Sequence, residues 1–241
     1  MNIYSYVPLL TWQTLLMPEI FAHRGLHVTE RENTISAFQA AVALGVDGVE
    51  LDVRRTRDGV LVVHHDPHIE ELIIANALAS ELPSYVPTLQ DVMSVCTGIT
   101  VNVEIKNIPS EPGYDASGDF ARSVLNCLHE NNWESSVVIS SFDKATCAVV
   151  RSFDSMMGIG WLLWKEELED AITQSHVLGF NAINPHFTKV NASVMAKAKE
   201  LGIKVNTWTV NTPDDISAMA ALGVDTIITD DPKTALALTR K

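Results

Sequence analysis

Short apolar runs rich in Val and Ile alternate along the chain with longer segments in which apolar residues recur three or four positions apart. The first pattern is typical of buried strands and the second of helices. Strands are predicted at residues 20–23, 48–54, 60–64, 100–105, 137–141, 158–163, 182–184, 204–210 and 226–229. Helices are predicted from residue 33 or 34 to 44 and at 89–95, 119–131, 144–153, 168–177, 192–201, 214–222 and 234–240. This alternation indicates βα units and a parallel sheet.

One pair of strands departs from the alternation. The sequence Arg57-Asp58-Gly59 is a tight-turn signal that joins the strand at 48–54 directly to the strand at 60–64 as a hairpin. When the second strand of the hairpin is counted as an addition, eight βα units remain. The predicted fold is therefore α/β, a (β/α)8 TIM barrel with an extra β-hairpin strand after the second strand.

The length of 241 residues suits one barrel domain, and no Pro-rich or Gly/Ser-rich linker divides the chain. We expect the domain to span residues 19–241. The apolar segment 1–18 is expected to be an N-terminal extension that closes the bottom of the barrel or packs on a neighbouring subunit, which makes a homo-oligomer one expected state. Weak binding at an interface, or disorder, is the alternative for this segment.

The formal net charge of −13 argues against nucleic acid and anionic membranes as partners, because both require a basic surface. No apolar run approaches the roughly 20 residues of a membrane span, so stable membrane insertion is not expected. Three widely spaced cysteines, Cys96, Cys127 and Cys147, are expected to be reduced core thiols. Together with the lack of a charged leader before Arg24, these features predict a cytoplasmic protein.

Polar side chains follow most of the predicted strands, whereas the strand starts are mostly Gly, Val, Ile and Ala. In a (β/α)8 barrel the chemistry belongs at the carboxyl ends of the strands, which meet at one mouth. The residues at or just after strand ends are His23, Arg24, Glu50, Asp52, His65, Asp66, Glu104, Lys106, Ser141, Phe142, Asn184, His186, Trp208, Asn211 and Asp230.

Glu50 and Asp52 lie two positions apart on one strand, so both side chains leave the same face. Glu104 holds a similar position on the next strand of the barrel. Three carboxylates brought together inside a barrel repel one another unless a hard cation lies between them, and oxygen ligands suit Ca2+ or Mg2+. We therefore predict one divalent cation on Glu50, Asp52 and Glu104. The competing interpretation is a surface ion network of the two strand carboxylates with Arg54 or Arg55.

His23 and His65 end strands that converge on the same mouth, and two imidazoles near neutrality can serve as a general acid and a general base. Arg24 and Lys106 are suited to phosphate oxygens. Phe142 and Trp208 are candidates to wall the pocket against the uncharged part of a ligand, or else belong to the barrel packing. His186 is a further candidate. The other histidines are expected at surface or loop positions, and they are His27, His64, His68, His129 and His176.

The order of these residues resembles the glycerophosphodiester phosphodiesterases. The resemblance covers about residues 21–241 and rests on His23-Arg24-Gly25, Glu32-Asn33-Thr34, Glu50-x-Asp52, His65-Asp66, Glu104-Ile105-Lys106, Ser141-Phe142, Trp208-Thr209-Val210-Asn211, Gly223-Val224-Asp225 and Ile227-Ile228-Thr229-Asp230. Each motif is short, but in this order on these strands they are specific. Arg31 replaces a proline that is common before the Glu-Asn-Thr, and the segment between Asp66 and Pro87 is shorter than in many relatives, so substrate choice is left open.

The resemblance implies a small-molecule glycerophosphodiester as substrate and sn-glycerol 3-phosphate and an alcohol as products. It further implies metal binding by Glu50, Asp52 and Glu104, acid–base catalysis by His23 and His65, and phosphate contacts from Arg24 and Lys106. Glu32 would be an additional metal ligand or would orient a histidine; Asn33 and Asn211 are expected in supporting positions. The alternatives are a phospholipase D-like hydrolase of lysophospholipids and a catalytically inactive barrel that binds phosphodiesters.

Overall fold

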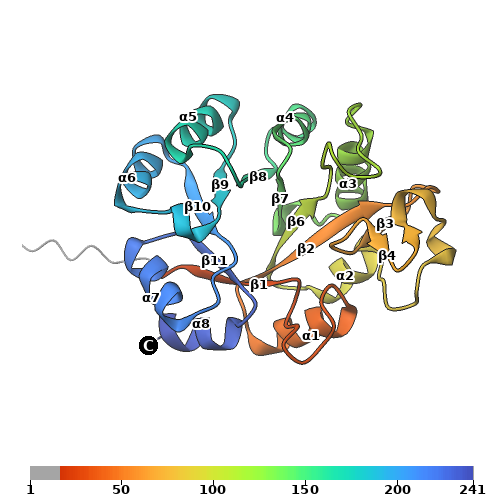
Figure 1. The fold of residues 1–241 in the computed structure, drawn as a ribbon, viewed down its shortest axis with the longest axis horizontal. Helices are drawn as coiled ribbons and strands as arrows, with labels where there is room; N and C mark the ends of the chain where they lie inside the picture. The colour runs from red at the N-terminus through yellow and green to blue at the C-terminus, as the bar shows by residue number, and fades with distance from the viewer. Residues whose placement is uncertain (1–16, 241) are drawn as a thin grey trace, which may run out of the picture.

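The computed structural model describes residues 17–240, and it arranges helices around a closed ring of strands (Figure 1). The strands of the ring are all parallel, and pairing of the first with the second closes it. In chain order they are β1 (Glu19–His23), β2 (Gly48–Arg55), β6 (Thr100–Ile105), β7 (Val137–Ser141), β8 (Gly158–Leu163), β9 (Ala182–Pro185), β10 (Lys204–Thr207) and β11 (Thr226–Thr229). The predicted eight-stranded barrel is confirmed.

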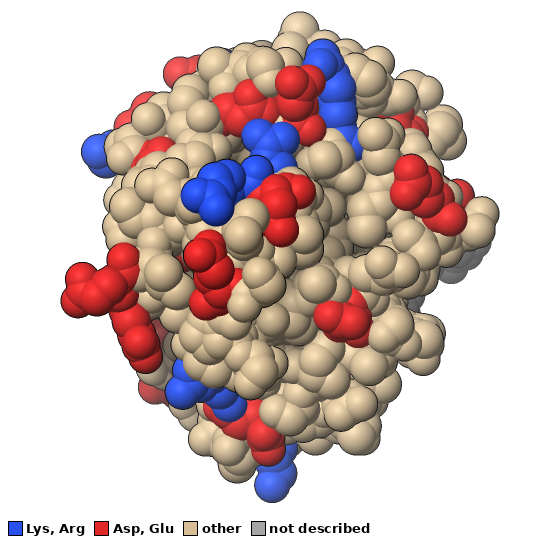
Figure 2. Space-filling view, turned by 90° about the vertical axis from the view of Figure 1, so that its right-hand side faces the viewer, with Lys and Arg blue, Asp and Glu red and all other residues tan. Residues whose placement is uncertain are grey.

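One strand stands outside the ring, as the hairpin signal predicted. β3 (Leu61–Val63) pairs antiparallel with β2 alone among the barrel strands. An excursion follows, made of the small hairpin of β4 (His68–Ile69) and β5 (Leu72–Ile73) and the short 3-10 helices η1 (Ile74–Asn76) and η2 (Ala79–Glu81). The excursion projects to one side of the barrel in Figure 1. On this side Lys and Arg side chains lie beside Asp and Glu side chains (Figure 2).

The helices of the barrel lie between successive strands and cover them from outside. They are α1 (Ile35–Leu44), α2 (Leu89–Val95), α3 (Asp119–Glu130), α4 (Lys144–Phe153), α5 (Leu168–Leu178), α6 (Ala192–Leu201), α7 (Pro213–Leu222) and α8 (Pro232–Thr239), with a 3-10 turn η3 (Glu134–Ser136) before β7 and η4 (Phe187–Lys189) after β9. A continuous core of Val, Ile, Leu and Phe fills the space between strands and helices. None of the helices in the described part of the chain has the length and hydropathy needed to cross a membrane.

Several boundaries differ from the predicted ones for identifiable reasons. Helices α7 and α8 begin at Pro213 and Pro232, earlier than expected, because proline fits the first turn of a helix, where its missing N–H is not needed. Strand β10 stops at Thr207, before Trp208, and the chain continues with an isolated bridge between His186 and Trp208.

The remaining predictions about the chain as a whole have separate outcomes. All three cysteines are free thiols, with Cys96 and Cys147 buried and Cys127 half-buried. The prediction for the N-terminal segment 1–18 concerns residues that lie almost entirely outside the described part of the chain.

Candidate active site

The parallel register brings the predicted acidic residues together at the carboxyl ends of β2 and β6. Asp52 stands opposite Glu104 in the pairing of these two strands, and His23 at the end of β1 stands opposite Glu50. One oxygen from each of the three carboxylates lies within 4.8 Å of the others. All three side chains are buried. The three carboxylates therefore form the cluster that was predicted from the two-residue alternation along β2 and the position of Glu104 on the next strand.

Burial and mutual repulsion strain this carboxylate cluster. Loss of hydration, together with the charges of Asp52 and Glu104, holds the pKa of Glu50 well above its usual range. Burial also acts to raise the pKa of Asp52, but Lys106 and Arg24 overcome it and hold that pKa well below its usual range. Two cationic side chains thus face three crowded carboxylates, and the raised pKa of Glu50 reflects the cost of burying a third negative charge beside Asp52 and Glu104.

This donor set fits a hard divalent cation. Oxygen ligands are those that Ca2+ and Mg2+ prefer, and a bound cation would relieve the repulsion that raises the pKa of Glu50. The competing ion network with Arg54 and Arg55 does not form. Arg54 instead pairs with Glu111 at 2.9 Å, and Arg55 lies 3.7 Å from Asp115.

The two candidate phosphate ligands are already next to the cluster. Lys106 Nζ lies 2.9 Å from Glu104 Oε1 and 3.4 Å from Asp52 Oδ1. Arg24 Nε lies 3.3 Å from Asp52 Oδ2, while its Nη1 donates to both oxygens of Glu32 at 3.0 and 3.1 Å. Glu32 thus holds the arginine, and it belongs neither to the carboxylate cluster nor to a histidine pair. Its predicted role as an additional metal ligand or histidine partner stays a prediction, and the contact described here is with Arg24.

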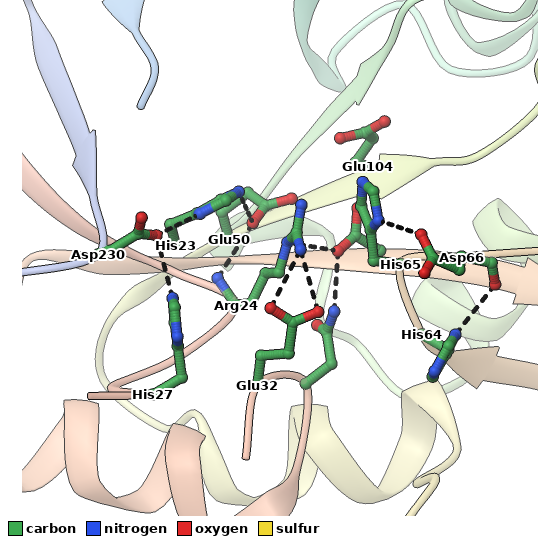
Figure 3. Close-up of polar contacts among 12 residues, drawn as sticks. His23, Arg24, His27, Glu32, Glu50, His64, His65, Asp66, Glu104 and Asp230 are labelled. Atoms are coloured by element: carbon green, nitrogen blue, oxygen red, sulfur yellow. Dashed lines mark hydrogen bonds and ion pairs between the residues drawn. The ribbon is translucent and has the colours of Figure 1, made fainter. Parts of the chain in front are cut away.

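The two histidines reach the carboxylate cluster from separate segments of the chain (Figure 3). His23 Nδ1 is 2.6 Å from Asp230 Oδ1, and its Nε2 is 3.9 Å from Glu50 Oε2. His65 Nδ1 is 2.7 Å from Asp66 Oδ1. A carboxylate accepts but cannot donate, so each Nδ1 carries a hydrogen and each Nε2 is left for a reacting group. Both rings are thus held at Nδ1 by a carboxylate.

Asp230 is held firmly as the partner of His23. Its Oδ2 accepts from Asn211 Nδ2 at 2.6 Å, and its backbone N–H donates to Asn211 Oδ1 at 2.9 Å. Burial raises its pKa, but hydrogen bonds from His23, His27 and Asn211 outweigh this and keep the pKa well below the usual range. Asn211 has the supporting position that the sequence predicted. Asn33 has one as well, because its Nδ2 donates to Asp52 Oδ2 at 2.8 Å from a left-handed backbone conformation.

A cavity of about 220 Å³ opens among these residues at the barrel mouth. Its charged side is formed by His23, Arg24, Glu50, His65, Glu104 and Lys106. Its aromatic side is formed by Phe142, Trp164 and Trp208, which follow β7, β8 and β10. The rings of Trp164 and Trp208 stack with centroids 5.5 Å apart, and Phe142 meets Trp208 edge-on at 5.5 Å. The mouth is thus divided between a half suited to phosphate and a half suited to carbon.

Comparison with known proteins agrees with this geometry. Residues 23–234 match the model of the glycerophosphoryl diester phosphodiesterase family. A glycerophosphodiester phosphodiesterase from Caldanaerobacter subterraneus is 32% identical over 92% of this chain and 98% of its own length. The chain belongs to the glycerophosphoryl diester phosphodiesterase family.

Solved structures show the same fold. A crystal structure of a glycerophosphodiester phosphodiesterase from Parabacteroides distasonis is 25% identical and superposes with a TM-score of 0.83, covering 92% of this chain and 96% of that one. An Oleispira antarctica phosphodiesterase, solved in complex with the product sn-glycerol-3-phosphate, is 19% identical with a TM-score of 0.84, covering 93% and 98%. This family member therefore shares the barrel of enzymes seen in crystals.

The roles of three residues of this family member were missed or underestimated when only the sequence was considered. Asp230 was noted as a strand end and as the close of a motif, without a role of its own, yet it is the carboxylate partner of His23. His27 was expected at a surface or loop position, and its ring also reaches Asp230, at 3.0 Å. Trp164 was not singled out, although a tryptophan directly after a predicted strand end was an available signal. His186 contacts Trp164 and Trp208 edge-on, behind the aromatic side.

Proposed function

We propose that this chain hydrolyses glycerophosphodiesters to sn-glycerol 3-phosphate and an alcohol, with His23 and His65 as the general acid–base pair and with Glu50, Asp52 and Glu104 as ligands of one divalent cation. One observation supports this most strongly. Two histidines, each hydrogen-bonded through Nδ1 to a carboxylate, line one cavity together with Glu50 and Glu104 of the buried three-carboxylate cluster. The product named for the Oleispira antarctica neighbour supports the choice of substrate.

The phosphodiester would occupy the charged half of the mouth. Arg24 offers a planar fork and Lys106 a point charge for non-bridging oxygens, and both line the cavity. A bound Ca2+ or Mg2+ would supply Lewis-acid polarisation of the phosphoryl group. Phe142 and Trp208 would cover the carbon skeleton of the substrate on the other half.

The imidazoles of His23 and His65 carry out the proton transfers. One ring, neutral at the start, accepts a proton from the nucleophile at Nε2, while the other starts as the imidazolium and gives its Nε2 proton to the departing alkoxide. Asp230 and Asp66 stabilise each ring in its charged form. The nucleophile is either water or the neighbouring glycerol hydroxyl. The second route forms a cyclic phosphate that water opens in a later step, and it benefits from proximity.

A coupled assay for released glycerol 3-phosphate, with released head-group alcohol measured for the lysophospholipid, tests the proposal. Glycerophosphocholine, glycerophosphoethanolamine, glycerophosphoglycerol and a lysophospholipid are compared, with and without chelator. We expect release from the glycerophosphodiesters alone, and only with metal. Turnover of the lysolipid with none of the water-soluble diesters would favour the phospholipase D-like alternative, and no turnover of any substrate would indicate an inactive barrel. ³¹P NMR during turnover distinguishes a cyclic phosphate from direct hydrolysis.

A further inference from the structure

His27 shares a single carboxylate oxygen with His23. Its Nε2 lies 3.0 Å from Asp230 Oδ1, the same atom that His23 Nδ1 contacts at 2.6 Å. Because a carboxylate can only accept, His27 must donate its Nε2–H. The two rings stand edge-on with centroids 6.2 Å apart, so they approach the oxygen from different directions (Figure 3).

Asp230 is thereby held from three separate segments of the chain. His23 belongs to β1, His27 to the loop after β1, and Asn211 to the segment after β10. Donors from His23 and His27 occupy Oδ1 and the amide of Asn211 occupies Oδ2, which fixes the plane of the carboxylate. Without His27, Oδ1 would keep one partner and the carboxylate could turn about its terminal torsion, where rotamer preferences are broad.

The position of His27 is built into the loop that carries it. Gly25 has φ +82°, and a Cβ there would lie 2.8 Å from the backbone of Ala37 on α1. Leu26 N–H donates to the Ala37 carbonyl at 2.9 Å, and Asn33 N–H donates to the Arg24 carbonyl at 3.0 Å. The loop is therefore packed against the start of α1, and His27 reaches Asp230 from a fixed base.

His27 does not line the cavity that would receive the phosphodiester. The charged groups that face it are Asp230, Glu32, Arg24 and His23. Its hydrogen bond to Asp230 raises its pKa in spite of partial burial, which gives the contact charge-assisted character. Its arrangement suits a group that acts through another side chain and does not touch substrate.

We propose that His27 is a positioning residue, which locks the carboxylate of Asp230 so that His23 keeps the Nδ1–H tautomer and presents Nε2 to the reacting group. The proposal rests on the acid–base role given to His23 above. Mutation of a side chain that orients a functional residue commonly lowers activity by about 10- to 100-fold. Because loss of His27 removes only one donor to Asp230, we expect an effect near the lower end of this range.

The first test separates the donor from the shape of the side chain. His27→Leu removes the donor, whereas His27→Gln keeps an N–H at a similar reach. We expect kcat to fall about tenfold in His27→Leu with KM changed less than about twofold, and to recover to within about threefold of wild type in His27→Gln. His176→Leu, which removes a histidine bonded to the Leu201 carbonyl far from the mouth, is the matched control and should leave kcat unchanged.

The second test asks whether His27 acts through Asp230. In a double-mutant cycle, His27→Leu should add little to the loss already caused by Asp230→Asn, because the locked carboxylate is gone. Wild-type kcat in His27→Leu, failure of His27→Gln to rescue it, or full additivity with Asp230→Asn would each overturn the proposal. If His27→Leu does not fold, His27→Asn, whose amide falls short of Asp230, replaces it.

A third measurement does not need turnover. Long-range ¹⁵N–¹H spectra of the His23 ring report its tautomer, and we expect Nδ1–H in the wild type and in His27→Gln, with a mixture in His27→Leu. An unchanged tautomer in His27→Leu would refute the positioning role even if the enzyme proved inactive on every glycerophosphodiester. Conversely, a changed tautomer with no activity would leave the role of His27 intact and refute the proposed function.

Discussion

The guanidinium of Arg54 donates two hydrogen bonds to the backbone carbonyl of His65, with its Nε 2.9 Å from that oxygen. Arg54 belongs to β2, and its side chain is only 6% exposed. His65 lies after β3, in the segment that leads into the excursion. The buried guanidinium of Arg54 therefore holds the backbone of His65 in place. The imidazole that projects from this backbone is itself about one-third exposed.

Arg54→Lys should therefore loosen His65 without removing the charge that pairs with Glu111. A point charge cannot reproduce the two-pronged contact with one oxygen. We expect kcat to fall roughly tenfold with little change in KM, since a hydrogen bond from a charged donor is worth about 1.5 kcal/mol. Steady-state kinetics beside a circular dichroism melt measures this, and unchanged kcat in a folded variant would contradict it.

Loss of either catalytic imidazole should be far more severe. His23→Ala and His65→Ala are each expected to lower kcat on the order of 10²- to 10⁴-fold, because each removes one proton-transfer group while the other remains. The melting temperature should change little, since neither ring belongs to the hydrophobic core. Near-normal turnover in one variant would remove that residue from the mechanism.

Asp230 and Asp66, the carboxylate partners of the two histidines, should contribute differently to kcat. Asp230 is 34% exposed at its side chain and bonded to three side chains, whereas Asp66 is 68% exposed and solvated. An interaction in a drier setting is stronger, so Asp230→Asn should cost at least tenfold more in kcat than Asp66→Asn. Equal losses in the two variants would show that burial does not set their contributions.

Removal of divalent metal should abolish activity, and Ca2+ or Mg2+ should restore it. The same ions should raise the melting temperature of the chelated protein, because an ion that binds only the folded state stabilises it. Glu104→Gln removes one charged ligand and should diminish that rise, while Glu130→Gln, at the end of α3, serves as the control. Full activity of thoroughly chelated enzyme would refute the metal site.

The contact between His27 and Asp230 should make stability depend on pH. The pKa of His27 is raised in the folded state, so its contribution is complete below the unfolded value of about 6.5 and is lost as pH rises through the folded value. The difference in free energy of unfolding between wild type and His27→Gln should accordingly shrink as pH is raised from about 5.5 to 9. Urea unfolding at several pH values measures it, and a difference that grows with pH would reverse the assigned sign.

The sequence was a better guide to the carboxylates than to their surroundings. Alternation along β2 placed Glu50 and Asp52 on one face because strand geometry repeats every two residues. No comparable rule connects His27 to Asp230, which lie 203 positions apart. Glu32 shows the same limit, since its neighbours in the chain gave no sign that it would hold Arg24.

The order of strands and helices, the strand outside the ring and the residues at the barrel mouth were all determined by the sequence, because apolar periodicity and turn residues act over a few positions. Tertiary structure alone decided that His23 bonds Asp230, which cation faces which acid and how the aromatic rings and the charged groups divide the mouth. These contacts depend on barrel closure, which brings β11 beside β1 and sets the register of β2 against β6. Such closure fixes distances between residues that no local pattern relates.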